Sequence, residues 1–148
     1  MKLKSIFLAF ALLSLPINTV AKEIKCDNKS TCMKDKNLYV TVKRVVQRGK
    51  VLIIQLNFIA LNNLYISFSD GKRGEGAILL DAEGKEFKIS GDKISNMDLG
   101  NGSNKVLSLR FKGDIKAPFD LTIKTKRKEF TLFDLKPEGQ TKNSDGNK

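Results

Sequence analysis

The alternation of apolar and polar residues over residues 51–58 constrains the fold more than any other feature of the chain. Every second side chain of this run is large and apolar, and the residues between them include two amides. Successive side chains of a β-strand point to opposite faces, so this pattern is typical of a strand with one buried face. We therefore expect a strand that buries Leu52, Ile54, Leu56 and Phe58.

A second alternating run, residues 38–46, precedes the first and predicts its pairing partner. The last apolar residues of this run slip out of phase with the others, which predicts a β-bulge near residues 43–44. Gly49 lies between the two runs and supplies a tight turn. Two alternating runs around a short glycine turn predict a β-hairpin.

The remainder of the chain up to residue 135 contains further short apolar or alternating runs that are separated by turn residues. No segment shows a helical period of useful length, although residues 90–104 predict a long loop with a short helical turn near residues 94–97. About seven to eight short strands joined by close turns predict an all-β fold, an antiparallel β-sandwich or barrel. The further strands are expected at residues 64–68, 77–80, 85–89, 105–111, 119–123 and 129–135.

Several of these runs follow a recurrent bacterial pattern: a central strand that ends near Asn57, an Asp-x-x-Gly turn within residues 79–87, a glycine turn leading into residues 107–111, and a final Phe-x-Leu strand at residues 130–132. With them the chain resembles the immunoglobulin-like domain family of small exported bacterial proteins, the family of the mycobacterial immunoprotective extracellular protein. The resemblance covers residues 38–135. It implies an immunoglobulin-like sandwich of seven or eight strands and no shared catalytic residues.

The N-terminus has the organisation of a bacterial secretory signal peptide. Lys2 and Lys4 precede a short apolar stretch, and small residues end at Ala21, where we expect cleavage. The mature chain is therefore expected to be periplasmic or secreted and to contain no transmembrane segment. The expected organisation is a signal peptide (1–21), a disulfide-stapled segment (22–37), a β-sandwich domain (38–135) and a disordered polar tail (136–148).

Cys26 and Cys32 are the two cysteines of the chain. A structural zinc site needs four ligands, and the sequence has no further cysteine and no histidine. A thiol redox motif has two residues between its cysteines, whereas five separate these. Paired thiols of exported proteins tend to form disulfides. We therefore expect a Cys26–Cys32 disulfide that staples the segment leading into the domain.

The chain is strongly basic, with a formal net charge of +11 that falls to +9 when Lys2 and Lys4 leave with the signal peptide. Such a charge favours acidic proteins or anionic envelope components as partners, and export argues against nucleic acid. Two expected turns are candidate contacts for an anion or a partner. They would form one patch if they lay at the same end of the sandwich, and would otherwise be separate solvated turns. The candidate residues are Arg48 and Lys50 in the first turn and Lys124, Lys126, Arg127 and Lys128 in the second.

The absence of histidine removes most general-base, nucleophilic and transition-metal chemistry. Paired carboxylates remain possible, and a carboxylate enzyme would need groups such as Asp81, Asp98 and Asp114 to converge. The acidic residues mostly lie in turn-like segments, where solvent rather than a substrate is expected. We therefore expect no catalytic residue, no metal site and no cofactor.

The sequence favours a small exported protein that acts by binding, through surface and loop contacts with an envelope protein or polyanion. The alternative is an inhibitor or immunity protein that acts against an exported enzyme or toxin, for which the loops at residues 69–76 and 90–104 are available. A subunit that receives a donated strand at an exposed sheet edge is also compatible with a β fold.

Overall fold

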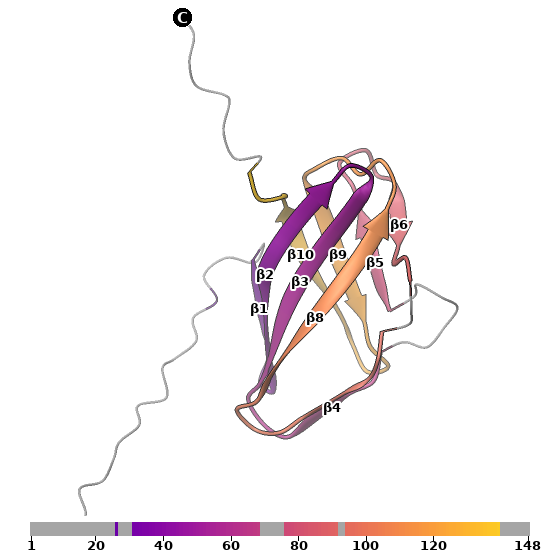
Figure 1. Cartoon of the computed structure of the whole chain (residues 1–148). Helices are drawn as coiled ribbons and strands as arrows, with labels where there is room; N and C mark the ends of the chain where they lie inside the picture. Colours follow the sequence, from indigo (N-terminus) through magenta and orange to yellow (C-terminus); the bar gives the residue numbers. More distant parts are fainter. Residues whose placement is uncertain (1–25, 27–30, 69–75, 92–93, 140–148) are drawn as a thin grey trace, which may run out of the picture.

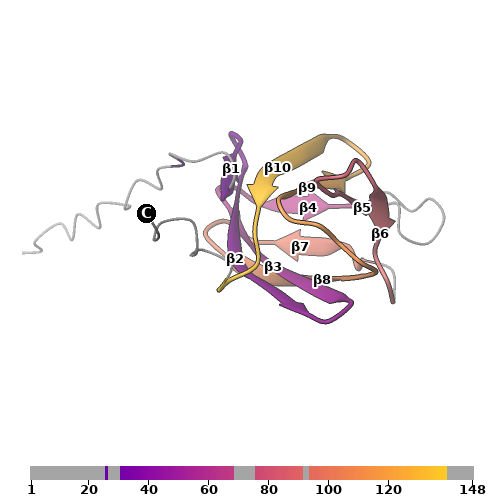
Figure 2. The same ribbon diagram turned by 90° about the horizontal axis from the view of Figure 1, so that it is seen from above.

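The structure is a computed structural model, and it describes residue 26 and residues 31–68, 76–91 and 94–139. The predicted signal peptide lies outside the described residues. The described chain is all β, and it contains no helix of the length and hydrophobicity that a membrane span requires. Two four-stranded antiparallel sheets lie face to face, as Figures 1 and 2 show. The predicted fold class, an all-β antiparallel sandwich, is confirmed.

The first sheet has the strand order β1-β2-β3-β8. Its centre is the predicted hairpin, with a turn at Gly49, whose φ of 56° lies in the left-handed region that glycine adopts without strain. The register shifts between Val42 and Arg44, so the predicted bulge is confirmed. The strands are β1 (Cys32–Lys34), β2 (Leu38–Arg48), β3 (Val51–Ala60) and β8 (Asn104–Lys112).

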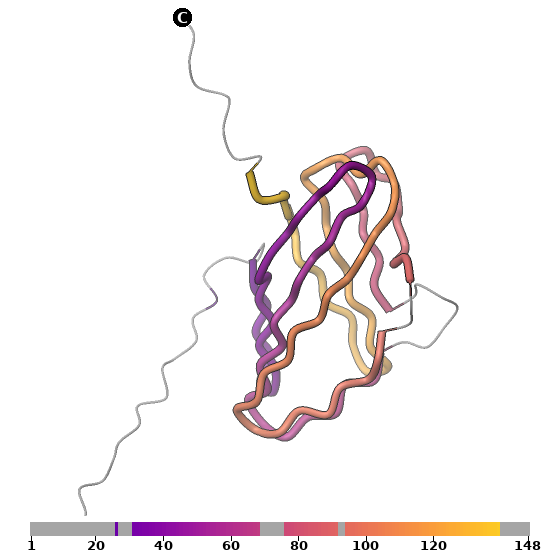
Figure 3. The backbone as a smooth tube through the Cα atoms, viewed as in Figure 1, coloured from indigo at the N-terminus to yellow at the C-terminus, as the bar shows by residue number. Residues whose placement is uncertain are grey.

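The second sheet has the order β10-β9-β5-β6, and a separate two-stranded sheet joins β4 to β7. The short β4–β7 sheet crosses the lower end of the sandwich in Figures 1 and 3, close to the turn between β9 and β10. The β2–β3 turn lies at the upper end. The strands are β10 (Glu129–Leu135), β9 (Phe119–Lys124), β5 (Ala77–Leu80), β6 (Glu86–Lys88), β4 (Leu64–Ile66) and β7 (Met97–Leu99).

The core fills the space between the two sheets with the side chains that the alternation predicted. The four predicted inward residues of β3 are fully buried. Phe58 packs edge-to-face against both Phe68 and Phe130, with ring centroids 6.3 Å apart in each pair. Such aromatic pairs add about 0.5–1.5 kcal/mol to the burial of their surface. This aromatic cluster lies toward the end of the sandwich that β4 and β7 cross.

The structure corrects two expectations about local structure. The helical turn predicted near residues 94–97 is absent from the described residues there, and Met97–Leu99 instead form β7. Met97 and Leu99 are buried on one side of this strand while Asp98 is exposed on the other. A three-residue strand carries too short an alternation to be distinguished from a loop. The predicted number of strands, seven to eight, was too low: the described residues form ten strands, and β1 and β7, with three residues each, were not predicted.

The two terminal segments are joined to the domain where they are described. The stapled segment contributes β1, which pairs with β2 and belongs to the first sheet. At the C-terminus, the Glu138 backbone N–H donates to the Val45 carbonyl oxygen, and the Glu138 carboxylate lies 3.3 Å from Arg44 Nε. The rest of the predicted tail, residues 140–148, lies outside the described residues.

Candidate binding pocket

The predicted disulfide is present, with 5.8 Å between the Cα atoms of Cys26 and Cys32. Cys32 is buried and begins β1, opposite Thr41 of β2. The bridge therefore fastens the N-terminal segment at the edge of the first sheet. It is a structural feature and leaves no free thiol in the chain.

The two predicted basic turns lie at opposite ends of the sandwich. Arg48 is the last residue of β2, whereas Leu38, the first residue of β2, lines a pocket together with Lys126 and Arg127. A strand of this length spans roughly 30 Å. A single patch would have required both turns to lie at the same end of the sandwich. The Arg48–Lys50 turn and residues 124–128 therefore form two separate basic surfaces (Figure 1).

Residues 124–128, which we call the basic tip, have a defined conformation. Thr125 Oγ1 accepts hydrogen bonds from the backbone N–H groups of Arg127 and Lys128, at 3.3 and 3.1 Å. The backbone N–H of Thr125 donates to the Lys128 carbonyl oxygen at 2.9 Å. The backbone N–H of Lys126 donates to the Ser67 carbonyl oxygen at 2.8 Å. These bonds close the turn and hold it beside the segment that follows β4.

Two of the four cations of the basic tip form ion pairs with acidic residues, and the other two form none among the described residues. Lys124 Nζ lies 3.7 Å from a carboxylate oxygen of Glu129, and Lys128 forms an ion pair with Asp35. Among the described residues, the side chains of Lys126 and Arg127 have no carboxylate partner within ion-pair distance. Both are exposed. Two cations of the tip therefore remain available to a ligand.

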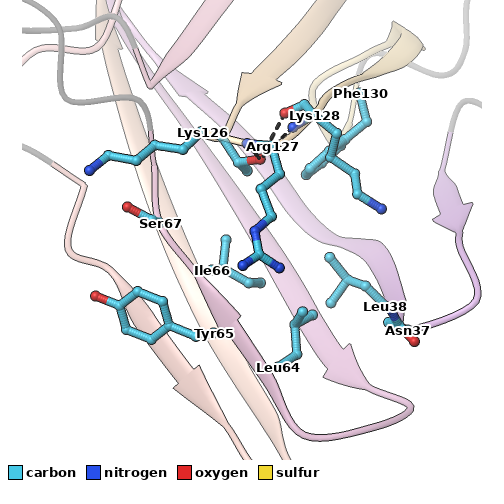
Figure 4. A pocket seen from close by; sticks show the side chains of 11 residues that line it. Asn37, Leu38, Leu64, Tyr65, Ile66, Ser67, Lys126, Arg127, Lys128 and Phe130 are labelled. Carbon is cyan, nitrogen blue, oxygen red and sulfur yellow. Dashed lines mark hydrogen bonds between the residues drawn. The ribbon is translucent and has the colours of Figure 1, made fainter.

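A pocket of about 350 Å³ lies beneath the basic tip. Its apolar surface comes from three elements, β2, β4 and β10, and its rim includes Asn37, Ser67 and the tip. Figure 4 shows that the Arg127 side chain extends from the tip into the pocket, whereas Lys126 and Lys128 point away on either side. Tyr65 stands at the edge and is 59% exposed. The apolar side chains that line the pocket are Leu38, Leu64, Ile66 and Phe130.

The arrangement places over apolar side chains one guanidinium that has no carboxylate partner in the part of the chain that the structure describes. A guanidinium presents its N–H donors in a plane and can bind a carboxylate or a phosphate through two parallel hydrogen bonds. Apolar walls with a few placed polar groups are the usual composition of ligand sites, and a volume of about 300–1,000 Å³ is typical of them. The pocket can therefore hold an anionic group and an apolar group at the same time.

The three acids considered for a carboxylate enzyme do not form one cluster, because Asp81 and Asp114 both contact Lys116 whereas Asp98 lies in β7. Asp81 is 5% exposed and accepts hydrogen bonds from the backbone N–H groups of Glu83, Lys85 and Lys116, at 2.9–3.3 Å. Burial alone would raise the pKa of Asp81, but these backbone donors outweigh it and the pKa is lowered. Asp81 therefore organises the turn after β5.

Of the other two acids, Asp114 shares Lys116 with Asp81, and Asp98 lies on a different element. Asp114 binds Lys116 Nζ at 3.2 Å, and this hydrogen bond and the charge of Asp114 raise the pKa of Lys116. Asp98 lies in β7 opposite Tyr65, at the end of the sandwich where the pocket lies. The part of the chain that the structure describes contains no group of three acidic or cysteine side chains able to hold a metal ion.

Sequence reasoning found the cations of this site but missed its apolar floor. Leu38, Ile66 and Phe130 are buried and belong to alternating runs, so in sequence they resemble ordinary core residues. Their position in a pocket depends on the short β4–β7 sheet, which the sequence did not predict. The sequence signal that could have pointed to the floor is Tyr65, a large aromatic residue on the polar face of its run.

No family model matches this chain, and no curated protein matches it. Three solved structures are similar. The Bacillus subtilis chain described as a "putative lipoprotein (ycdA)" superposes with a TM-score of 0.50 at 11% identity over 71% of this chain, which spans 39% of the YcdA chain. The Bacillus subtilis YjhA protein has a TM-score of 0.46 and 17% identity, over 62% of this chain and 76% of its own.

The third is MPT63, a secreted protein from Mycobacterium tuberculosis. It superposes with a TM-score of 0.45 at 11% identity, over 69% of this chain and 89% of MPT63. At these identities the likenesses bear on the fold alone.

Proposed function

We propose that this chain is an exported, non-catalytic binding protein that engages an anionic partner at the pocket beneath its basic tip. The observation that carries the proposal is the position of Arg127, which has no carboxylate partner among the described residues and extends over an apolar floor (Figure 4). A guanidinium with no carboxylate partner among the described residues can gain a charged hydrogen-bonding partner from a ligand, and the half-buried Leu64 beside it can gain apolar contact.

Two features support action outside the cytoplasm, in the periplasm or the medium. The leader has the organisation of a signal peptide that is cleaved after Ala21. The Cys26–Cys32 disulfide is of a kind that persists in oxidising compartments.

The chemistry of the chain supports binding rather than catalysis. The sequence contains no histidine, and each candidate acid already has its own role or place: Asp81 accepts three backbone hydrogen bonds, Asp114 pairs with Lys116, and Asp98 lies on another element. The conformation of the basic tip is fixed by its own hydrogen bonds, and a fixed surface loses little entropy on binding. We propose an envelope protein or an anionic envelope component as the partner.

The test compares the two basic ends of the molecule. The protein, expressed with its own leader, is used to capture partners from the envelope fraction of the same organism at low and at high salt. The Lys126→Glu/Arg127→Glu variant changes the charge by the same amount as the control variant Arg48→Glu/Lys50→Glu. We expect the first variant to lose capture at all salt concentrations and the control to retain it.

Capture that is unchanged by the Lys126→Glu/Arg127→Glu substitutions, or that is lost only with the control variant, would contradict the proposal. Thermal unfolding of both variants shows whether each is folded. The two substituted pairs are exposed, so we expect midpoints close to that of the unaltered protein.

A further inference from the structure

We infer that the pocket beneath the basic tip binds a small amphiphilic anion, a molecule with one carboxylate or phosphate group on a short apolar tail. This inference rests on the proposed function and names the ligand class of the same site. Three observations carry it: the floor, the single cation that enters the pocket, and the pairing of the neighbouring cations.

The floor provides a surface for an apolar tail. Most of its open apolar surface comes from Leu64, which is half-buried, and Tyr65, which is 59% exposed. The other apolar lining residues, Leu38, Ile66 and Phe130, are each less than one-tenth exposed. These side chains belong to three different strands that are fixed in the fold, so the floor exists before a ligand arrives. The volume of about 350 Å³ is at the lower end of the range for ligand sites. It suits one short chain or one ring rather than a two-chain lipid.

The head group is specified by Arg127. Its guanidinium lies within the pocket, while the side chains of Lys126 and Lys128 point out to either side (Figure 4). A planar guanidinium can bind the two oxygens of a carboxylate or a phosphate at once. The low polarity of the floor strengthens this attraction relative to the same pair in bulk water.

The pairing of the neighbouring lysines limits the charge of the ligand. Lys124 is held by Glu129 and Lys128 by Asp35, so neither is available without breaking an ion pair. A polyanionic chain would gain most from several free cations on one surface. One guanidinium inside the pocket, and beside it one lysine with no carboxylate partner among residues 31–68, 76–91 and 94–139, fit a single anionic group better than an acidic polymer or an acidic protein segment.

The test is a titration of the full chain with hexanoate, octanoate and decanoate, and with the matching alkyl phosphates, below their aggregation concentrations. Each added methylene that enters the pocket should tighten binding about four-fold until the floor is covered. The methyl resonances of Leu38, Leu64 and Ile66 should shift as the complex forms. The carboxylate and phosphate series show which head group the site prefers.

Substitutions then separate the head group from the tail. The Arg127→Gln variant should bind octanoate about ten-fold more weakly or worse, because it loses a charged hydrogen-bond donor. The matched variant Arg48→Gln, at the opposite end, should bind like the unaltered protein. The Leu64→Gln variant should weaken binding of the longer tails more than that of hexanoate. A thermal unfolding curve of this variant checks that the domain is folded.

Three outcomes would overturn the inference. Octanol or octyltrimethylammonium binding as tightly as octanoate would show that the charge of the head group is irrelevant. Acetate or inorganic phosphate binding as tightly as octanoate would show a plain anion site. Lack of any amphiphile binding by a protein that still captures an envelope partner through Lys126 and Arg127 would remove this ligand class. That last result would contradict only the ligand class and not the proposed function. A protein that neither binds an amphiphile nor captures a partner through Lys126 and Arg127 would contradict both.

Discussion

The two ends of this sandwich carry similar basic turns in sequence, yet they differ in what lies beneath the charges. At one end, the carbonyl oxygen of Lys50 accepts a hydrogen bond from Gly113, and the Gln47 side chain donates to the Ile115 carbonyl oxygen. Backbone contacts thus close this end, which we call the closed end. At the other, the basic tip lies over a pocket with an apolar floor. A basic turn is therefore a candidate binding site only where a pocket lies beneath it.

The largest expected effect concerns the packing of the closed end. Gly113 has a φ of 147°, and a Cβ atom built on it would lie 2.5 Å from the Phe87 ring. Gly113→Ala should therefore lower the free energy of unfolding by about 2–5 kcal/mol, through overpacking and backbone strain. The measurement is chemical denaturation followed by far-ultraviolet circular dichroism, because the chain contains no tryptophan for a fluorescence signal.

The matched control for this prediction is Gly49→Ala, at the exposed β2–β3 turn of the same end. Gly49 also has a positive φ, of 56°, but a Cβ atom there would meet no heavy atom within 4 Å. We expect a loss of about 1 kcal/mol from backbone strain alone. Equal losses for the two variants would show that the closed end is not packed as described.

A smaller effect depends on pH and also belongs to the closed end. The pKa of Asp81 is lowered in the folded protein, since the backbone donors outweigh the burial that would raise it. A lowered pKa contributes stability that is fully present above the unfolded-state value, about 4, and is lost as the pH falls through the folded value. The stability advantage of the unaltered protein over Asp81→Asn should therefore shrink as the pH falls below about 4.

Urea denaturation of both proteins between pH 7 and pH 2 measures this difference. Ligand binding by Asp81→Asn at pH 7, where the variant remains folded, should match that of the unaltered protein because Asp81 lies away from the pocket. A stability difference that grows toward low pH would contradict the role of Asp81 as an ionised acceptor of backbone hydrogen bonds.

The smallest effect sharpens the distinction between paired and unpaired cations within the basic tip. Lys124 and Glu129 are exposed and lie 3.7 Å apart, so the pair should contribute about 0.2–1 kcal/mol to stability. Lys124→Gln should change binding at the pocket less than two-fold, while Arg127→Gln changes it ten-fold or more. A larger effect of Lys124→Gln on binding would mean that the ion pair opens to admit the partner.

Much of the fold was predictable because its longest strands alternate strictly. The hairpin of β2 and β3, its bulge and the inward face of β3 all follow from the period of two in residues 38–58. The three-residue strands β1 and β7 were not predictable, because pairing with β2 and β4 rather than their own pattern makes them strands. The disulfide followed from the number of cysteines and from the export that the leader predicts.

The candidate site was predictable only in its charges. The cations of residues 124–128 are visible in the sequence, but the partners of Lys124 and Lys128 depend on where Glu129 and Asp35 lie in the fold. The floor depends on the β4–β7 sheet, which places Leu64 and Ile66 below the tip. The alternation of apolar and polar residues indicates which side chains can be buried. The position of a pocket depends instead on how strands that are distant in the sequence pack together.

The central claim is that recognition occurs at the pocket and not at the closed end. The most direct test is a methyl nuclear magnetic resonance spectrum of the labelled protein, recorded before and after addition of soluble envelope extract from the same organism. We predict shifts or broadening at Leu38, Leu64 and Ile66, with Val51 beside the Arg48–Lys50 turn unchanged. Changes confined to Val51 and its neighbours, with the pocket methyls unaffected, would contradict the account.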